Sequence, residues 1–101
     1  MKVLSYHEAK EDPLKCVVTI SIEKWGGFII QDIKLFERGG ARWFHFPSKY
    51  TVLDDGRKKH FEYVHFDSRE IRDAFHKELF KTVSDYKLKK QREKLLKDTP
   101  L

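Results

Sequence analysis

The chain has 101 residues, of which 40% are hydrophobic and 14% aromatic, and its formal net charge is +5. This length suffices for one small domain with one core and excludes a second domain, while the apolar content is high enough for a folded chain. The modest excess of positive charge favours polyanionic partners.

Alternation of apolar and polar residues predicts several antiparallel strands. Every second residue from Cys16 to Ile22 is apolar, which is typical of a strand with one buried face. Gly26 and Gly27 separate this strand from residues 28–37 and predict a tight two-residue hairpin with positive φ at both positions. A Gly39–Gly40 break precedes residues 42–46, and the turn at residues 54–56 precedes residues 57–66. We expect four strands, or five if residues 2–7 form another.

From residue 68 the apolar spacing changes to three and four, which predicts a helix that begins at residue 67 or 68. Its buried face is expected to hold Ile71, Ala74, Phe75, Leu79, Val83 and Tyr86. Asp67 is placed to cap the first amides, and Glu70 to meet the positive end of the helix dipole. Residues 87–101 favour helix but hold few apolar anchors, so we expect a domain of residues 1–86 and a basic, helix-prone, partly frayed extension.

The strand at residues 28–37 is apolar on both faces. We expect one face to hold Ile29, Ile33 and Leu35. The opposite face is expected to hold Phe28, Ile30 and Phe36. One helix covers only one face of a small sheet, so the second face is predicted to pack against another copy of the chain. The sequence thus predicts a homodimer with Phe28, Ile30 and Phe36 in its interface.

The sequence gives little support for an enzyme. The five histidines lie on different predicted elements, and no closely spaced Cys/His set of the zinc-binding kind occurs. Cys16, the single cysteine, lies in mid-strand on the apolar side, where a buried, unreactive thiol is the usual state. We therefore expect no enzyme activity, no metal, no cofactor and no small-molecule substrate.

The first residues turn polar too soon for a signal peptide, and no apolar run reaches membrane-spanning length. We expect a cytoplasmic protein that does not bind membranes.

The basic residues give a clearer indication of function. Four cations are expected to converge across the turn at residues 54–56, namely Lys49, Arg57, Lys58 and Lys59. Four more follow along the helix, namely Arg69, Arg72, Lys77 and Lys81. Such a surface, interleaved with aromatic residues, suits nucleic-acid binding. In the alternative interpretation the cations only solvate the surface and the aromatic residues pack a dimer interface, and composition alone leaves the two about equal.

Four segments, in order, carry a resemblance to a known family: "FIIQDIKLFE", "WFHFPSKY", "DDGRKKHF" and "REIRDAFHKELF". From about Leu14 to Val83 the chain resembles the stage V sporulation protein G family, also called septation proteins. The resemblance implies an α+β fold, a single small domain in which a curved antiparallel sheet of four to five strands is followed by a C-terminal α-helix, in a homodimer. It also implies a non-enzymatic regulator of gene expression, linked to sporulation or cell division, that binds DNA and in some members RNA.

The family is thought to contact nucleic acid at the start of the helix, which matches Arg69 and Arg72 here, whereas the hairpin cations are inferred from charge alone. The chain departs from the family at residues 65–67, where many members have His-Pro-Ile, and in its basic tail, where many have an acidic one. The competing expectation is a protein-interaction or structural dimer in septation that does not itself bind nucleic acid.

Overall fold

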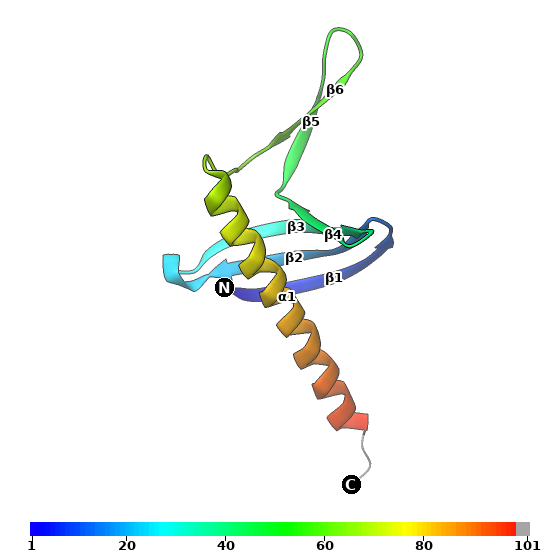
Figure 1. Cartoon of the computed structure of the whole chain (residues 1–101), viewed down its shortest axis with the longest axis vertical. Coiled ribbons are helices and arrows are strands. Elements are labelled where there is room, and N and C mark those ends of the chain that lie inside the picture. The colour runs from blue at the N-terminus through cyan, green and yellow to red at the C-terminus, as the bar shows by residue number, and fades with distance from the viewer. Residues whose placement is uncertain (99–101) are drawn as a thin grey trace.

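Four antiparallel strands form a curved sheet, and one long helix crosses a face of it, in a computed structural model that describes residues 1–98 (Figure 1). The strands are β1 (Lys2–Glu11), β2 (Leu14–Ile22), β3 (Phe28–Arg38) and β4 (Ala41–His45), in the spatial order β1-β2-β3-β4. Two further strands, β5 (Ser48–Val52) and β6 (Lys58–Glu62), pair only with each other, and α1 (Arg69–Asp98) follows them. The predicted single α+β domain is confirmed, and residues 2–7 belong to a strand.

The core lies between the sheet and α1. The alternation in β2 works as predicted, because Cys16, Val18, Ile20 and Ile22 are all buried. Leu79 is fully buried on the facing side of the helix, between Phe75 and Val83. Burying each side chain of this size stabilises the fold by about 1.5–3 kcal/mol, so this seam fixes the helix on the sheet.

In β3 the predicted division of the faces is wrong. Val18 pairs with Ile33 and Ile20 pairs with Ile30, so that two β3 residues lie opposite the single residue between them. At this bulge Asp32 has a φ of 55° and its N–H donates to Oγ1 of Thr19 at 3.3 Å. The extra residue reverses the alternation, which places Ile30 in the core at 9% exposure. Ile30 is therefore a core residue of its own chain.

The same bulge leaves other residues of β3 outside the core. Phe28 and Ile29 are about half exposed. Phe36 is half-buried, and its ring stacks on Trp43 with the centroids 5.5 Å apart. Of the three residues predicted for a dimer interface, Phe28 and Phe36 thus remain available at the surface.

The two glycine pairs form different connections. The predicted two-residue hairpin at Gly26–Gly27 is wrong, because a single 3₁₀ turn, η1 (Glu23–Trp25), precedes the glycines and lengthens the loop to five residues. The predicted positive φ values are confirmed at 71° and 87°. Gly39 and Gly40, with φ of 59° and 83°, instead make the two-residue hairpin between β3 and β4.

Strands β5 and β6 form an arm, residues 48–62, that projects from the sheet (Figure 1). Its register runs from Ser48↔Glu62 to Val52↔Lys58, and the tip turns at Gly56, which has a φ of 82°. Phe46, just before the arm, is buried at 3% exposure, and Pro47 has no N–H to continue a strand ladder. The chain therefore leaves β4 at an anchored corner and does not extend the main sheet.

Ser68, and not Asp67 as predicted, caps the helix. The hydroxyl of Ser68 accepts from the N–H of Ile71 at 3.4 Å, and the N–H of Arg72 donates to the Ser68 carbonyl at 3.1 Å. The prediction of the buried helix face is correct from Phe75 onward. It is wrong for the first turn, where Ile71 is 56% exposed and Ala74 is also exposed.

Beyond Tyr86 the helix continues to Asp98, so residues 87–98 of the predicted extension are helical, and residues 99–101 lie outside the described residues. Within residues 1–98, α1 is too polar to cross a membrane.

Candidate nucleic-acid interface

The arm does not gather its cations into one patch. Lys49 pairs with Phe61 and Thr51 with Lys59, so these side chains share one face of the ribbon. The ammonium group of Lys59 lies 5.1 Å from the centroid of the Phe61 ring, within the range of a cation–π contact. Lys58 pairs with Val52 on the opposite face. The predicted group of four is thus split, with Lys49 and Lys59 beside an aromatic ring.

At the tip of the arm, Arg57 is held by an acid of the same turn. Its Nε lies 2.5 Å from Oδ2 of Asp55, and its backbone N–H donates to Oδ1 of Asp55 at 3.1 Å. The pair is exposed, so it shapes the turn and contributes little to stability. Because the carboxylate compensates the guanidinium, Arg57 adds less positive potential than the sequence suggests.

The second face of the arm is aromatic and apolar. His60 forms a short hydrogen bond with the hydroxyl of Ser48, and its ring lies 5.0 Å from that of Tyr50. Tyr50 and Val52 are both about two thirds exposed. The two faces of the ribbon therefore differ in chemistry.

Arg72, a predicted nucleic-acid contact, turns inward. Its guanidinium lies 4.5 Å from the ring centroid of Phe44 and donates to the Phe44 carbonyl oxygen at 3.3 Å. It also lies 3.9 Å from Oε1 of Glu62 at the base of the arm. Position 72 precedes Phe75 and Leu79 by three and seven residues, which puts it on the inner face of the helix. These contacts hold the guanidinium against the fold, so Arg72 is less accessible to nucleic acid than the resemblance implies.

Arg69 is exposed, as predicted, but its surroundings are acidic. Residues 62–73 hold four acidic side chains against two arginines, and Glu70 and Asp73 are among its helix neighbours. Lys77 and Lys81 are exposed one turn apart further along α1. The eight predicted residues thus lie on several surfaces: the arm, the start of the helix and the middle of the helix.

Most of the net positive charge lies in residues 87–101, outside the predicted site. Residues 1–86 hold 15 Lys and Arg against 14 Asp and Glu, a net charge of +1, whereas residues 87–101 hold 6 against 2, a net charge of +4. The predicted site included none of these tail cations. Counting charge segment by segment, instead of following the hairpin pattern, would have found them.

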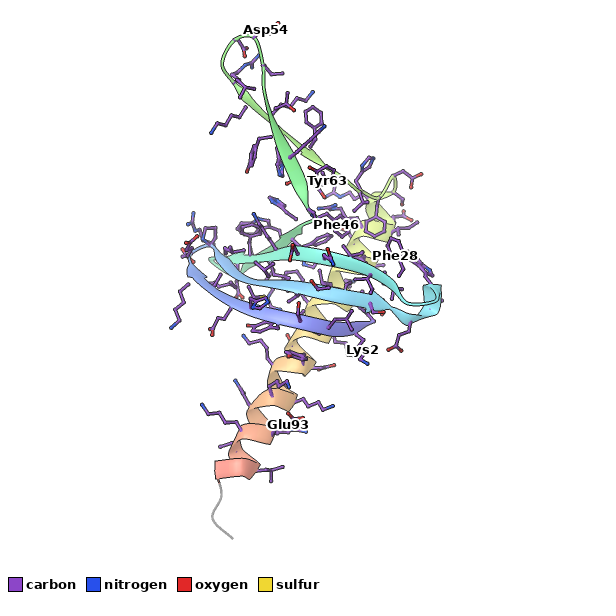
Figure 2. The ribbon with its side chains drawn as sticks, turned by 180° about the vertical axis from the view of Figure 1, so that it is seen from behind. Lys2, Phe28, Phe46, Asp54, Tyr63 and Glu93 are labelled. Carbon is purple, nitrogen blue, oxygen red and sulfur yellow. The ribbon has the colours of Figure 1, made fainter. Side chains whose placement is uncertain are left out.

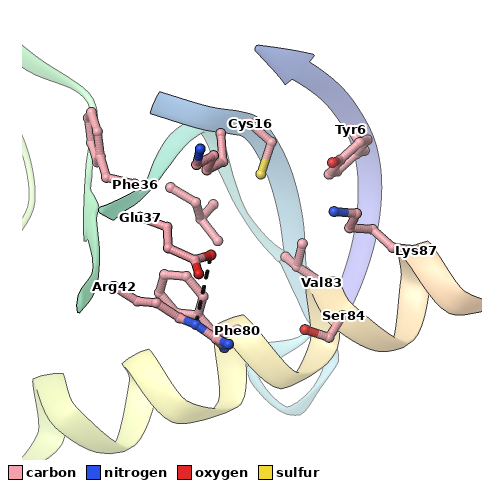
Figure 3. A pocket seen from close by; sticks show the side chains of 11 residues that line it. Tyr6, Cys16, Phe36, Glu37, Arg42, Phe80, Val83, Ser84 and Lys87 are labelled. Carbon is pink, nitrogen blue, oxygen red and sulfur yellow. Dashed lines mark ion pairs between the residues drawn. The ribbon is translucent and has the colours of Figure 1, made fainter. Parts of the chain in front are cut away.

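A cavity of about 250 Å³ opens between α1 and the sheet (Figure 3). Arg42 lies 4.0 Å from Glu37 and 5.9 Å from the ring centroid of Phe80. Cys16 and Lys87 also line the cavity. Burial raises the pKa of the Cys16 thiol, an effect that the nearby Lys87 ammonium partly offsets, so the group stays a protonated, weak nucleophile.

The histidines of the described residues do not cluster with acids or Cys16 into groups of three able to hold a metal. His45, at the base of the arm, has its pKa lowered by burial, and its ring lies 4.9 Å from that of Phe36.

A second, apolar cavity of about 380 Å³ lies where the arm joins the sheet. Phe28 and Ile29 line it from β3, and Tyr63 and Val64 line it from the segment that follows β6. β4 pairs only with residues 34–38 of β3, so the first half of β3 has no partner strand on that side within residues 1–98. Exposed rings and an unpaired strand edge therefore meet at this place.

Comparison with known proteins gave no relative. A scan of protein-family models, a search of curated proteins and a search of solved structures each found no match to this chain.

Proposed function

We propose that this protein is a small, non-enzymatic regulator of the stage V sporulation protein G type that binds DNA, or RNA, in the bacterial cytoplasm as a homodimer. The observation that carries the proposal is the projecting arm, one face of which joins Lys49 and Lys59 to Phe61. The resemblance in the order of the sequence segments gives independent support.

The arm has the chemistry that nucleic acid requires. A two-stranded ribbon fits the major groove of B-DNA, which is about 12 Å wide, and the two lysines supply phosphate contacts. Phe61 is 40% exposed, so its ring is accessible to an unstacked base as well. Because the arm projects from the sheet, a long polymer can reach this face without meeting the core.

A charge-matched pair of variants tests the proposal. The double variant Lys49→Gln/Lys59→Gln removes both cations from the arm face, and Lys10→Gln/Lys24→Gln removes two exposed cations of β1 and η1. In titrations of random duplex and single-stranded pools, the arm variant should reduce the magnitude of the slope of log affinity against log salt by about 1.4–1.8, since each lost phosphate contact contributes about 0.7–0.9. The control variant should leave the slope unchanged. Equal slopes for both variants and the native chain would refute the arm as a phosphate-binding surface.

The apolar surface at the base of the arm supports the dimer. Phe28, Ile29, Tyr63 and Val64 are exposed around one cavity beside the unpaired edge of β3. A second copy that covers this surface would bury aromatic and aliphatic area and add a strand to the edge. Sedimentation equilibrium at micromolar concentration should give about twice the chain mass, and Ile29→Asp/Val64→Asp should give the monomer. A native chain that sediments as a monomer would refute the dimer.

The same apolar surface favours the second candidate, a structural dimer of septation that does not bind nucleic acid. The two candidates differ in their response to salt. Phosphate binding weakens steeply as salt rises, because counterions are released on binding, whereas an apolar interface does not. A native chain that retains no duplex and no single strand at 50 mM salt would favour the structural dimer.

A further inference from the structure

The last three turns of α1, residues 87–98, form a basic segment that the fold does not use; we call it the basic helix end. It carries six Lys and Arg and two acidic residues. Every residue from 87 to 96 is exposed. The segment extends beyond the sheet on the side away from the arm, with Glu93 near its end (Figure 2). Because the basic helix end is exposed and extends beyond the sheet, core packing does not explain why it is so basic.

The basic helix end is held straight by the part of α1 that packs on the sheet. Leu79 and Val83 are buried, and Tyr86 meets Tyr6 of β1 with the ring centroids 5.8 Å apart. A helix of twelve residues alone in water is marginal because of its nucleation cost, but a segment that extends a packed helix avoids that cost. The ammonium of Lys90 adds contacts at 5.6 Å to the Tyr86 ring and 3.8 Å to Glu93.

The cations lie on two sides of this helix. At 100° per residue, Lys87, Lys90 and Lys94 lie within about 60° of one another, and Lys89 and Arg92 point about 130° and about 170° away from the middle of that group. The exposed leucines at 88, 95 and 96 would form a stripe, but Arg92 lies four residues after Leu88 and four before Leu96, in the middle of it. The segment therefore lacks the continuous apolar face of a helix that lies in a membrane surface or in a coiled coil.

Stabilisation of the helix itself explains only part of the charge. Cations near a helix C-terminus interact favourably with the macrodipole, but this effect fades within the last turn. Lys87, Lys89 and Lys90 lie two or more turns before Asp98. Within the described part of the segment, Lys90 forms the ion pair with Glu93, and no ion pair joins Lys89, Arg92 or Lys94 to an acid. These three cations are available to an external anion.

We propose that the basic helix end binds the phosphates of B-form duplex DNA, as a second surface separate from the arm. A helix with side chains is about 10–12 Å across and twelve residues span about 18 Å, which suits a major groove about 12 Å wide with phosphates on both walls. Cations on roughly opposite sides of the helix can face both walls. The inference rests on the proposed function, because it takes nucleic acid to be the partner.

The composition of the basic helix end favours binding to duplex DNA over single-stranded nucleic acid and duplex RNA. No aromatic residue follows Tyr86, so the segment offers no ring on which single-stranded bases could stack. The deep, narrow major groove of A-form RNA excludes a helix. Three phosphate contacts, by Lys89, Arg92 and Lys94, would contribute about −2.7 to the salt slope, and the affinity would fall on the order of 40-fold between 50 and 200 mM salt from this term.

The test uses the full chain and a random-sequence DNA duplex of 24 base pairs, followed by fluorescence anisotropy at several salt concentrations. The variant Lys89→Gln/Arg92→Gln/Lys94→Gln should reduce the magnitude of the salt slope by about 2.7 relative to the native chain. The charge-conserving variant Lys89→Arg/Arg92→Lys/Lys94→Arg should retain the native slope. The arm variant Arg57→Gln/Lys58→Gln/Lys59→Gln loses the same formal charge and should lower the slope less. Circular dichroism should show that all variants keep the native helix content.

The outcomes separate this inference from the proposed function. If the native chain binds no nucleic acid, both fail. If it binds the duplex and the helix variant keeps the native slope, the inference fails and the arm remains the binding surface. If the two glutamine variants lower the slope equally, the effect is one of overall charge and the inference also fails. Stronger binding to phosphatidylserine vesicles than to the duplex would overturn it in favour of a membrane. Stronger binding to the duplex than to single-stranded DNA or duplex RNA, with a larger loss in the helix variant than in the arm variant, would support it.

Discussion

Replacing Arg72 by alanine should destabilise the fold, although the sequence pattern assigned this residue to nucleic-acid binding. The side chain is 32% exposed, and its guanidinium makes three contacts: the Phe44 ring, the Phe44 carbonyl and Glu62. A hydrogen bond from a charged donor contributes about 1.5–3 kcal/mol, and a cation–π contact about 0.5–2 kcal/mol. The hydrogen bond is long and the ion pair with Glu62 is partly exposed, so we take the lower ends and expect a loss of about 2–3 kcal/mol.

The loss also includes a cost at Glu62. Among the described residues, Oε2 of Glu62 is a buried atom without a hydrogen-bond partner, so its carboxylate depends on the charge of Arg72. Urea unfolding followed by circular dichroism measures the effect: with a slope of about 1–2 kcal/mol per M, the midpoint should fall by about 1–3 M. Arg72→Lys, which keeps the charge but not the planar stack, should lose part of this stability. Arg69→Ala, at an exposed position, should stay within about 0.5 kcal/mol of the native chain. An Arg72→Ala variant with the native midpoint would refute the inward role of the side chain.

Two further perturbations test local features. Ser68→Ala should cost about 0.5–2 kcal/mol by removing the helix cap, whereas Asp67→Ala should cost less, and the reverse order in denaturant unfolding would contradict the assignment of the cap. Burial lowers the pKa of His45 in the folded chain, so its contribution to stability is present above the unfolded pKa of about 6.5 and is lost as the pH falls toward the folded pKa. The difference in unfolding free energy between the native chain and His45→Gln should therefore change over this acidic range, and a constant difference would show that His45 does not titrate differently on folding.

Where local pattern and packing agree, the fold followed from the sequence. Alternation from Cys16 to Ile22 predicted a buried face, and the structure has one. In β3 the same method failed, because one extra residue at Asp32 reversed the alternation. The local sign of the bulge is a pair of adjacent polar residues, Gln31 and Asp32, between two isoleucines. This pair breaks the alternation but does not show where the extra residue lies. A bulge is defined by its partner strand, and the partner register is not visible in one strand's sequence.

The candidate site was predicted less well, for a related reason. Arg72 was assigned to nucleic-acid binding through the family resemblance, yet it shares a helix face with Phe75 and Leu79, and the apolar part of an arginine packs well against an aromatic ring. The arm cations were grouped because they are close in sequence, but the strand pleat sends Lys58 and Lys59 to opposite faces. In both cases the geometry of the element, and not the residue type, decides which side chains meet.

The separation of the arm from the basic helix end leads to a prediction about the length of the binding site. The molecule is 65 Å long, and Asp54 at the arm tip and Glu93 on the helix lie toward its opposite ends (Figure 2). One turn of B-DNA, about 10 base pairs, covers about 34 Å, so a duplex that touched both surfaces of one protomer would be occupied over roughly 20 base pairs. A duplex held by one surface of one protomer would be protected over roughly half that length. Hydroxyl-radical footprinting of the native chain, with the glutamine variants of the arm and of the helix as controls, distinguishes these cases. If the native footprint extends over about two turns and each variant shortens it from one end, both surfaces bind the same duplex. If neither variant shortens the footprint, the two surfaces do not act together on one DNA molecule.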